Sequence, residues 1–145
     1  MAGIVVGVDG SEHSVEALRW AAEEAKLRGS VLHVAASFSA GILSTGYEVA
    51  SPDPADLSAA SNTMLGAAID TVRETGALDG VEVVTEVLEG HAGEQLIRLS
   101  RDAEMLVVGS RGHGGFVGLL MGSVTTYAVN HALCPVVVVR NQDVD

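Results

Sequence analysis

Five short runs rich in valine and isoleucine alternate with segments of helical periodicity, and this alternation limits the folds that the chain can adopt. Strands followed in turn by helices form parallel sheets, because each crossover returns the chain to the same end of the sheet. The pattern predicts an open five-stranded parallel sheet with helices on both faces, a Rossmann-like α/β fold. The chain of 145 residues, taken as 1–145, is expected to form one domain. The predicted strands are 4–8, 31–36, 81–88, 105–108 and 136–139.

Cap signals predict where the helices begin and end. Ser11 or Asp9 is placed to cap the first helix, and Gly29 is placed to end it. Asp53 is the predicted N-cap of the second helix, with Pro54 in its first turn, where the missing N–H costs nothing. A polar, glycine-bearing stretch, 37–53, separates the second predicted strand from this helix.

Charge excludes some partners. The formal net charge is −11, Lys26 is the single lysine, and the arginines are scattered. Such a chain repels nucleic acid and anionic membranes, and no apolar run approaches the ~20 residues that span a bilayer. Cys134 is the single cysteine, so no disulfide framework forms within the chain and a cytoplasmic location is expected.

The glycine-rich segment 109–125 follows the fourth strand and is the most informative part of the chain. It is longer than the ~2–6 residues usual for such a connection, and it opens a helix near Ser123. Glycines let backbone N–H groups approach an anion, and a helix N-terminus favours negative charge. Arg111 is its one formally positive residue and is placed to clamp a phosphate. The alternative is a flexible connector with a serine N-cap, against which the apolar residues of 116–121 argue.

Two common phosphate-binding motifs are absent from the sequence. A P-loop needs a lysine after its second glycine, and no lysine follows Lys26. A dinucleotide fingerprint belongs after the first strand, where the glycine spacing is wrong. Asp9 stands at that strand end, and two readings stay open for it from the residues: a turn residue that caps the helix, or a ligand contact.

The spacing Gly109-(two)-Gly112-(nine)-Gly122-Ser123 resembles the nucleotide-binding signature of the ATP-binding universal stress proteins. The start of the chain, 4–11, resembles that family's first strand with its terminal aspartate; 32–34 and 134–139 are similar to its second and last strands. The resemblance implies a fold of the adenine nucleotide alpha hydrolase type and a dimer. It also implies ATP or a related adenine nucleotide as ligand, often with a divalent metal, for which magnesium is the expectation.

The resemblance also assigns site residues by position. It places the turn after the first strand beside the nucleotide, the backbone of the second strand against adenine, and the glycine segment around ribose and phosphates. Members that lack the glycine signature bind no ATP, and this chain resembles the binding branch. The expected contacts are Asp9, Gly10 and Ser11; Val34; Val108, Gly109, Arg111 and Gly112; and Gly122, Ser123, Val124 and Thr125.

The first hypothesis for function is a regulatory protein of the universal stress type, in which an adenine nucleotide shifts conformation or partner affinity. Three alternatives remain: a slow ATPase or phosphotransferase, a cyclic AMP sensor, and an interaction module with an empty pocket. No residue is a convincing base for phosphoryl transfer, so no catalytic residue is assigned and fast hydrolysis is not expected. A bulky residue in place of Gly109 or Gly122 is expected to abolish binding while the fold survives.

Two further expectations concern the histidines and the last strand. His33 is expected to be a hydrogen-bonded core residue, and no Cys/His spacing supports a zinc site. The strand Val136–Val139 is expected at a sheet edge, where unpaired backbone groups invite a second chain. A homodimer through this strand is the resulting hypothesis.

Overall fold

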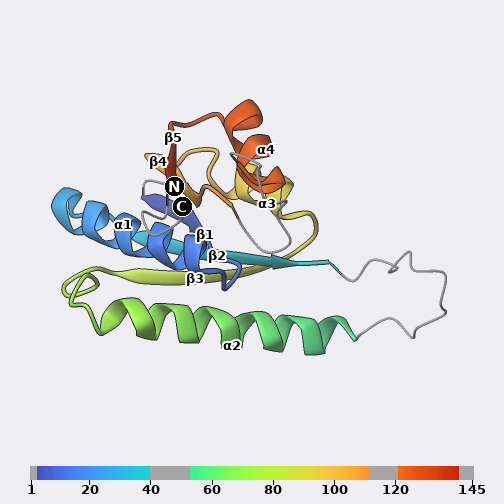
Figure 1. Ribbon diagram of the computed structural model, residues 1–145, viewed down its shortest axis with the longest axis horizontal. Helices are drawn as coiled ribbons and strands as arrows, with labels where there is room; N and C mark the ends of the chain where they lie inside the picture. Colours follow the sequence, from blue (N-terminus) through green and yellow to red (C-terminus); the bar gives the residue numbers. More distant parts are fainter. Residues whose placement is uncertain (1–2, 40–52, 112–120, 141–145) are drawn as a thin grey trace.

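The computed structural model describes residues 3–39, 53–111 and 121–140. Strands and helices alternate as predicted, and all neighbouring strands pair in parallel. The sheet has five strands in the order β3-β2-β1-β4-β5 (Figure 1). The elements are β1 (Ile4–Gly7), α1 (Glu12–Arg28), β2 (Leu32–Phe38), α2 (Pro54–Arg73), β3 (Val83–Glu89), α3 (Ala92–Leu99), β4 (Met105–Gly109), α4 (Ser123–His131) and β5 (Val136–Val139).

The helices form two layers, one on each face of the sheet. Alternate strand residues point to opposite faces, so Val6 packs with α1 and α2 whereas Val5 packs with α3 and α4. Figure 1 shows α2 along one face and the pair α3 and α4 on the other. The central strand β1 is covered on both sides, and Ile4, Val5 and Val6 have no exposed surface. The predicted α/β sandwich is therefore confirmed.

The predicted helix caps are confirmed in the structure. Ser11 is the N-cap of α1, and Gly29 ends that helix with φ 66°, a left-handed conformation that favours glycine. Asp53 caps α2 by accepting the Ala55 N–H at 2.9 Å. Strand β2 continues past its predicted end at residue 36, because β3 pairs with it as far as Phe38.

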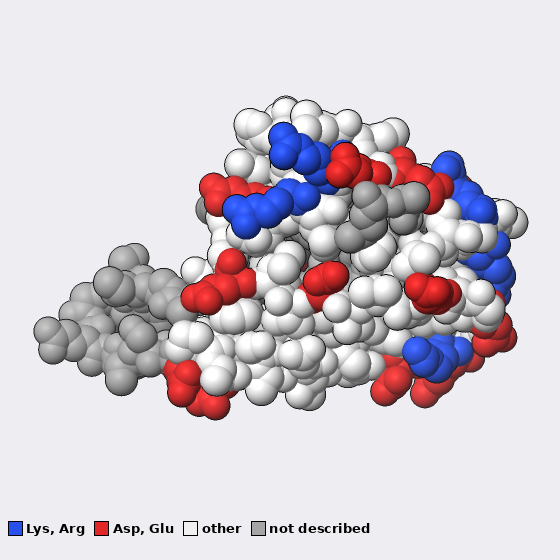
Figure 2. Space-filling model, turned by 180° about the vertical axis from the view of Figure 1, so that it is seen from behind, with Lys and Arg blue, Asp and Glu red and all other residues white. Residues whose placement is uncertain are grey.

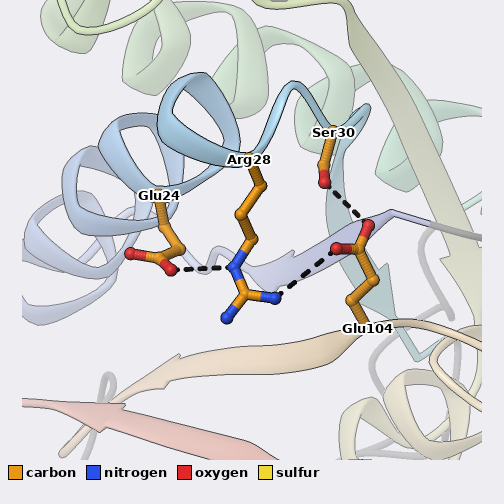
Figure 3. Close-up of polar contacts among 4 residues, drawn as sticks. All are labelled: Glu24, Arg28, Ser30 and Glu104. Carbon is orange, nitrogen blue, oxygen red and sulfur yellow. Dashed lines mark hydrogen bonds and ion pairs between the residues drawn. The ribbon is translucent and has the colours of Figure 1, made fainter.

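A polar network ties the end of α1 to the start of β4, at the amino end of the strands (Figure 3). Arg28 donates from Nε to Glu24 at 2.8 Å and lies 3.5 Å from Glu104, whose other oxygen accepts the Ser30 hydroxyl at 2.7 Å. The hydrogen bond with Glu24 raises the pKa of Arg28 above its usual value. One guanidinium therefore lies between two carboxylates and joins the end of α1 to the start of β4.

Candidate functional site

The carboxyl end of the sheet has a switch point between β1 and β4. From β1 the chain winds outward through β2 to β3, and it then returns to β4 on the other side of β1. Ligands of open α/β sheets bind outside the carboxyl ends of the strands at such a point. Val6 pairs with Val107 at the last paired position of these strands. Asp9 follows β1 and Ser110 follows β4, so the two segments predicted to bind the ligand leave neighbouring strands at the same edge of the sheet.

The turn after β1 is held together by its own side chains. Asp9 Oδ1 accepts the Ser11 N–H at 2.9 Å, and Ser11 Oγ accepts the Ser14 N–H at 3.2 Å. Gly10 has φ 87°, which only glycine adopts without strain. Of the two predicted caps, Ser11 is therefore the N-cap of α1. Asp9 shapes the turn and is exposed at the sheet edge.

Helix α4 begins differently. Its N-cap is Gly122, with φ −74° and ψ 168°, and no side chain of the described residues caps the helix. No acidic residue stands in its first turn, and Ser123 is exposed as the first helical residue. The N–H groups of a first helical turn have no acceptor within the helix. Among residues 3–39, 53–111 and 121–140, no side chain therefore satisfies this start of α4, and the serine N-cap of the alternative reading is not observed.

Short hydrogen bonds join the two ends of the glycine segment. The Gly122 N–H donates to the Ser110 carbonyl at 2.7 Å, and the Thr125 hydroxyl donates to the Gly109 carbonyl at 2.6 Å. Ser110 itself donates its N–H to the Val139 carbonyl of β5 at 2.9 Å. The structure thus brings Gly109, Gly122 and Thr125 together as predicted. Ser110, absent from the predicted site, connects them, and only its position between Gly109 and Arg111 pointed to it.

Gly109 has a packing role that the sequence did not reveal. A Cβ at this position would lie 2.7 Å from the His13 carbonyl oxygen and 2.8 Å from the carbonyl carbon. These are backbone atoms of α1, so they cannot swing aside. A larger residue at Gly109 therefore requires a shift of α1 or β4 and is expected to lower the stability of the fold, because glycine lets α1 approach the end of β4.

The remaining predicted residues differ in how deeply they are buried. Val34 is fully buried inside the sheet in register with Val6, so its side chain is not brought to the edge. Val108 is buried against α3 and α4, and Val124 is half-buried on α4. Arg111 is half-buried directly after β4 and Ser110. Gly112 lies outside the described residues.

The charge and metal predictions can be compared with the described part of the chain. The face in Figure 2 shows basic side chains in small separate groups among acidic ones, with no continuous basic surface. Within residues 3–39, 53–111 and 121–140, no three His, Cys, Asp or Glu side chains gather as a metal-ligand group. None of the described helices is long and apolar enough to cross a membrane.

His33 differs from its predicted role. It is buried at 6% exposure, but neither ring nitrogen has a hydrogen-bond partner among the described residues. Its ring instead covers Gly3, where a Cβ would lie 3.1 Å from two ring atoms. His91 caps α3 by accepting the Glu94 N–H at 3.4 Å, and its ring contacts the Tyr127 ring.

Comparison with solved structures gives the same fold. A universal stress protein in complex with cAMP aligns with a TM-score of 0.72 and 24% identity, over 96% of each chain. The universal stress protein from Archaeoglobus fulgidus in complex with dAMP aligns with a TM-score of 0.70 and 25% identity, over 95% of this chain and 97% of that one.

Comparison with sequences identifies the family. Universal stress protein Rv2623 of Mycobacterium tuberculosis is 34% identical over 145 residues, which cover 97% of this chain and 48% of that protein. The chain therefore spans about half the length of the curated relatives that it matches. A sequence model of the universal stress protein family matches residues 2–140, and the chain belongs to this family.

Proposed function

We propose that the chain binds an adenine nucleotide, ATP above all, at the switch point between β1 and β4. The observation that carries the proposal is the start of α4, where no described side chain caps the helix and the Gly122 N–H donates to the carbonyl of Ser110, just after β4, at 2.7 Å. A helix start without its own cap suits phosphate oxygens. These accept hydrogen bonds from the first N–H groups and lie at the positive end of the helix dipole. The A. fulgidus relative, in complex with dAMP, supports the adenine base.

Each part of the site has a proposed role. The first turn of α4, from Gly122 to Thr125, holds the phosphates through backbone N–H groups. Gly109, Arg111 and Gly112, with the backbone at Val108, line the ribose and phosphates. The turn of Asp9, Gly10 and Ser11 lies beside the nucleoside, whereas Val34, fully buried and paired with Val6 and Thr85, is given no contact. A net charge of −11 opposes an anionic ligand at long range, so these local donors must supply the attraction.

A magnesium ion fits this site as a companion of the nucleotide. Magnesium is commonly held by one or two carboxylates together with substrate phosphates, rather than by a cage of protein ligands. Asp9 is an exposed carboxylate that follows β1, the strand next to β4, at the carboxyl edge of the sheet. We propose that Asp9 faces such an ion, directly or through water, which also removes its repulsion of the phosphates.

The proposed role is regulatory: the nucleotide is a ligand that stabilises one conformation or one partner complex. Phosphoryl transfer needs a positioned base in addition to charge stabilisation. Arg111 and Ser123 stand at the site, and neither is a base at neutral pH. Phosphate release slower than about one turnover per minute, far below the enzyme median, is therefore expected.

Mass spectrometry of the supernatant from denatured purified protein tests the proposal, and the expected result is a released adenine nucleotide. Calorimetric titration of nucleotide-free protein with ATP and cyclic AMP, each with and without magnesium, then ranks the ligands. ATP is expected to bind more tightly with magnesium, and Asp9→Asn should reduce that difference. If neither nucleotide binds, the proposed function is refuted. If cyclic AMP binds more tightly than ATP, the protein is a cyclic-nucleotide sensor and not an ATP-regulated protein.

We further propose that two copies pair through β5. This strand is hydrogen-bonded to β4 alone and forms one edge of the sheet, as predicted. An edge of four valines is an open template for a second strand. Leu133, just before the strand, is 68% exposed and adds apolar surface nearby. Light scattering is expected to give a dimer at micromolar concentration, and a monomer there would contradict the pairing.

A further inference from the structure

The Thr125 hydroxyl is already engaged within the protein. Thr125 is 3% exposed, and its Oγ1 donates to the Gly109 carbonyl at 2.6 Å. A hydroxyl has one proton to donate. While this bond stands, the Thr125 side chain cannot donate to a phosphate, although the residue lies in the first turn of the helix that is proposed to hold phosphates.

The same bond closes a small hydrogen-bonded frame at the carboxyl end of the sheet. The carbonyls of Gly109 and Ser110, successive residues at the end of β4, accept from the Thr125 hydroxyl and the Gly122 N–H at 2.6 and 2.7 Å. The Thr126 N–H donates to the Gly122 carbonyl at 2.9 Å, which continues the frame into α4. Two donors from the helix start are therefore fixed on two neighbouring acceptors of the strand.

We infer that Thr125 is a positioning residue, whose hydroxyl fixes the first turn of α4 against β4 so that its N–H groups point to the phosphates. This inference rests on the proposed function. Hydrogen bonds to an anion weaken steeply as the donor angle departs from linear, so binding depends on how firmly the turn is held. Loss of the hydroxyl would leave a buried Gly109 carbonyl without its donor and release one of the two bonds that fix the turn.

Two substitutions separate the hydroxyl from the shape of the side chain. Thr125→Val keeps the volume and removes the donor, whereas Thr125→Ser keeps the donor and removes a methyl group. Thr126→Val is the matched control, because Thr126 is the next residue and is exposed. ATP and adenosine are the two probes, since adenosine has no phosphates. Affinities are measured by calorimetry, and the fold of each variant by circular dichroism.

Thr125→Val is expected to weaken ATP binding by about tenfold while adenosine binding changes by less than about twofold. Thr125→Ser and Thr126→Val are expected to bind ATP within about threefold of the unaltered protein. Unchanged ATP affinity in Thr125→Val would overturn the inference. An equal loss for ATP and adenosine, or an equal defect in Thr125→Ser, would also overturn it, because each would indicate general packing.

Amide hydrogen exchange of the ligand-free protein tests the positioning without any nucleotide. In Thr125→Val, the Gly122 and Thr126 amides are expected to exchange about tenfold faster, while the β1 amides keep their rates. Unchanged rates at Gly122 and Thr126 would refute the positioning role whatever the nucleotide result. If the unaltered protein binds neither ATP nor adenosine while these amides exchange faster in Thr125→Val, the proposed function is refuted and the positioning role of Thr125 is retained. If Thr125→Val does not fold, Thr125→Cys, with a weaker donor in a similar volume, takes its place in both measurements.

Discussion

Helices α1 and α4 begin at the same edge of the sheet, each at a Gly-Ser pair, yet their starts are built in opposite ways. In α1 the serine of the pair, Ser11, is the N-cap and is buried. In α4 the glycine, Gly122, is the N-cap, and Ser123 is the exposed first residue of the helix. The shift of one position removes the side-chain cap from α4.

This difference shows how one sheet edge can provide both a closed and an open helix start. At the start of α1, the Ser14 N–H donates to Ser11 Oγ and the Ser11 N–H donates to Asp9 Oδ1. Glu12 adds an acidic residue in the first turn. Within the described part of the chain, the start of α4 has neither a side-chain cap nor an acidic first-turn residue, and its Gly122 N–H donates to Ser110. The helix dipole and these differences favour an anion at α4 over α1, as the proposed function requires.

Giving α4 an acidic cap should break the comparison and have the largest effect. The φ −74° and ψ 168° of Gly122 suit any residue, so Gly122→Asp is compatible with the backbone. The new carboxylate would occupy the free N–H groups and repel phosphates, and like charges about 4 Å apart repel by about 4 kcal/mol before salt screening. ATP affinity measured by calorimetry is expected to fall by about a hundredfold or more.

Gly122→Asn is the control for this substitution, because it caps the helix without the charge. It is expected to lose less ATP affinity than Gly122→Asp and to unfold at the same or a higher urea concentration. If the aspartate variant binds ATP like the unaltered protein, the start of α4 is not the phosphate site. If both variants lose binding equally, the cap and not the charge excludes the ligand.

The next largest effect is expected on stability, at Gly109, which contacts His13 of α1 and accepts the Thr125 hydroxyl of α4. Gly109→Ala places a Cβ 2.7 Å from the His13 carbonyl oxygen of α1. Overpacking against backbone costs about 1–3 kcal/mol. Urea denaturation should show a free energy of unfolding lower by that amount.

Gly66→Ala is the opposite control, because it lies in α2 and a Cβ there meets nothing within 4 Å. It should raise the free energy of unfolding by about 1 kcal/mol through helix propensity. Equal effects of the two substitutions would show that α1 can move away from β4 at little cost, and the packing role of Gly109 would then be wrong.

The smallest effect sharpens the contrast between the two serines. Ser11→Ala removes the acceptor of the Ser14 N–H and should lower the free energy of unfolding by about 1 kcal/mol. Ser123→Ala removes no cap, so its urea midpoint should stay within error of the unaltered protein. The comparison fails if Ser123→Ala is the more destabilising of the two.

Much of the fold could be predicted from local patterns. The valine-rich strands, the caps at Ser11 and Asp53 and the terminator Gly29 are local signals, and the structure confirms them. The end of β2 at Phe38 was missed, because its last residues become strand through pairing with β3. That the ring nitrogens of His33 find no partner among the described residues was missed as well, since the residues that surround a side chain are not sequence neighbours.

The candidate site shows a similar division. The spacing of Gly109 and Gly122 pointed to one segment, and a hydrogen bond between Gly122 and Ser110 joins its two ends. Nothing in the sequence indicated that Gly109 is crowded by His13 of α1, or that the Thr125 hydroxyl is used by a carbonyl of β4. Both facts depend on how one helix lies against a strand that is distant in the chain.

The sequence by itself determined the order of strands and helices, the absence of a lysine from the glycine segment and the family, because each is written in residue type and spacing. Only the tertiary structure decided which glycine opens α4, which serine closes α1 and which hydroxyl joins β4 to α4. The physical reason is that a hydrogen bond or a steric contact depends on a few tenths of an ångström between distant segments, and only the packed sheet fixes that separation.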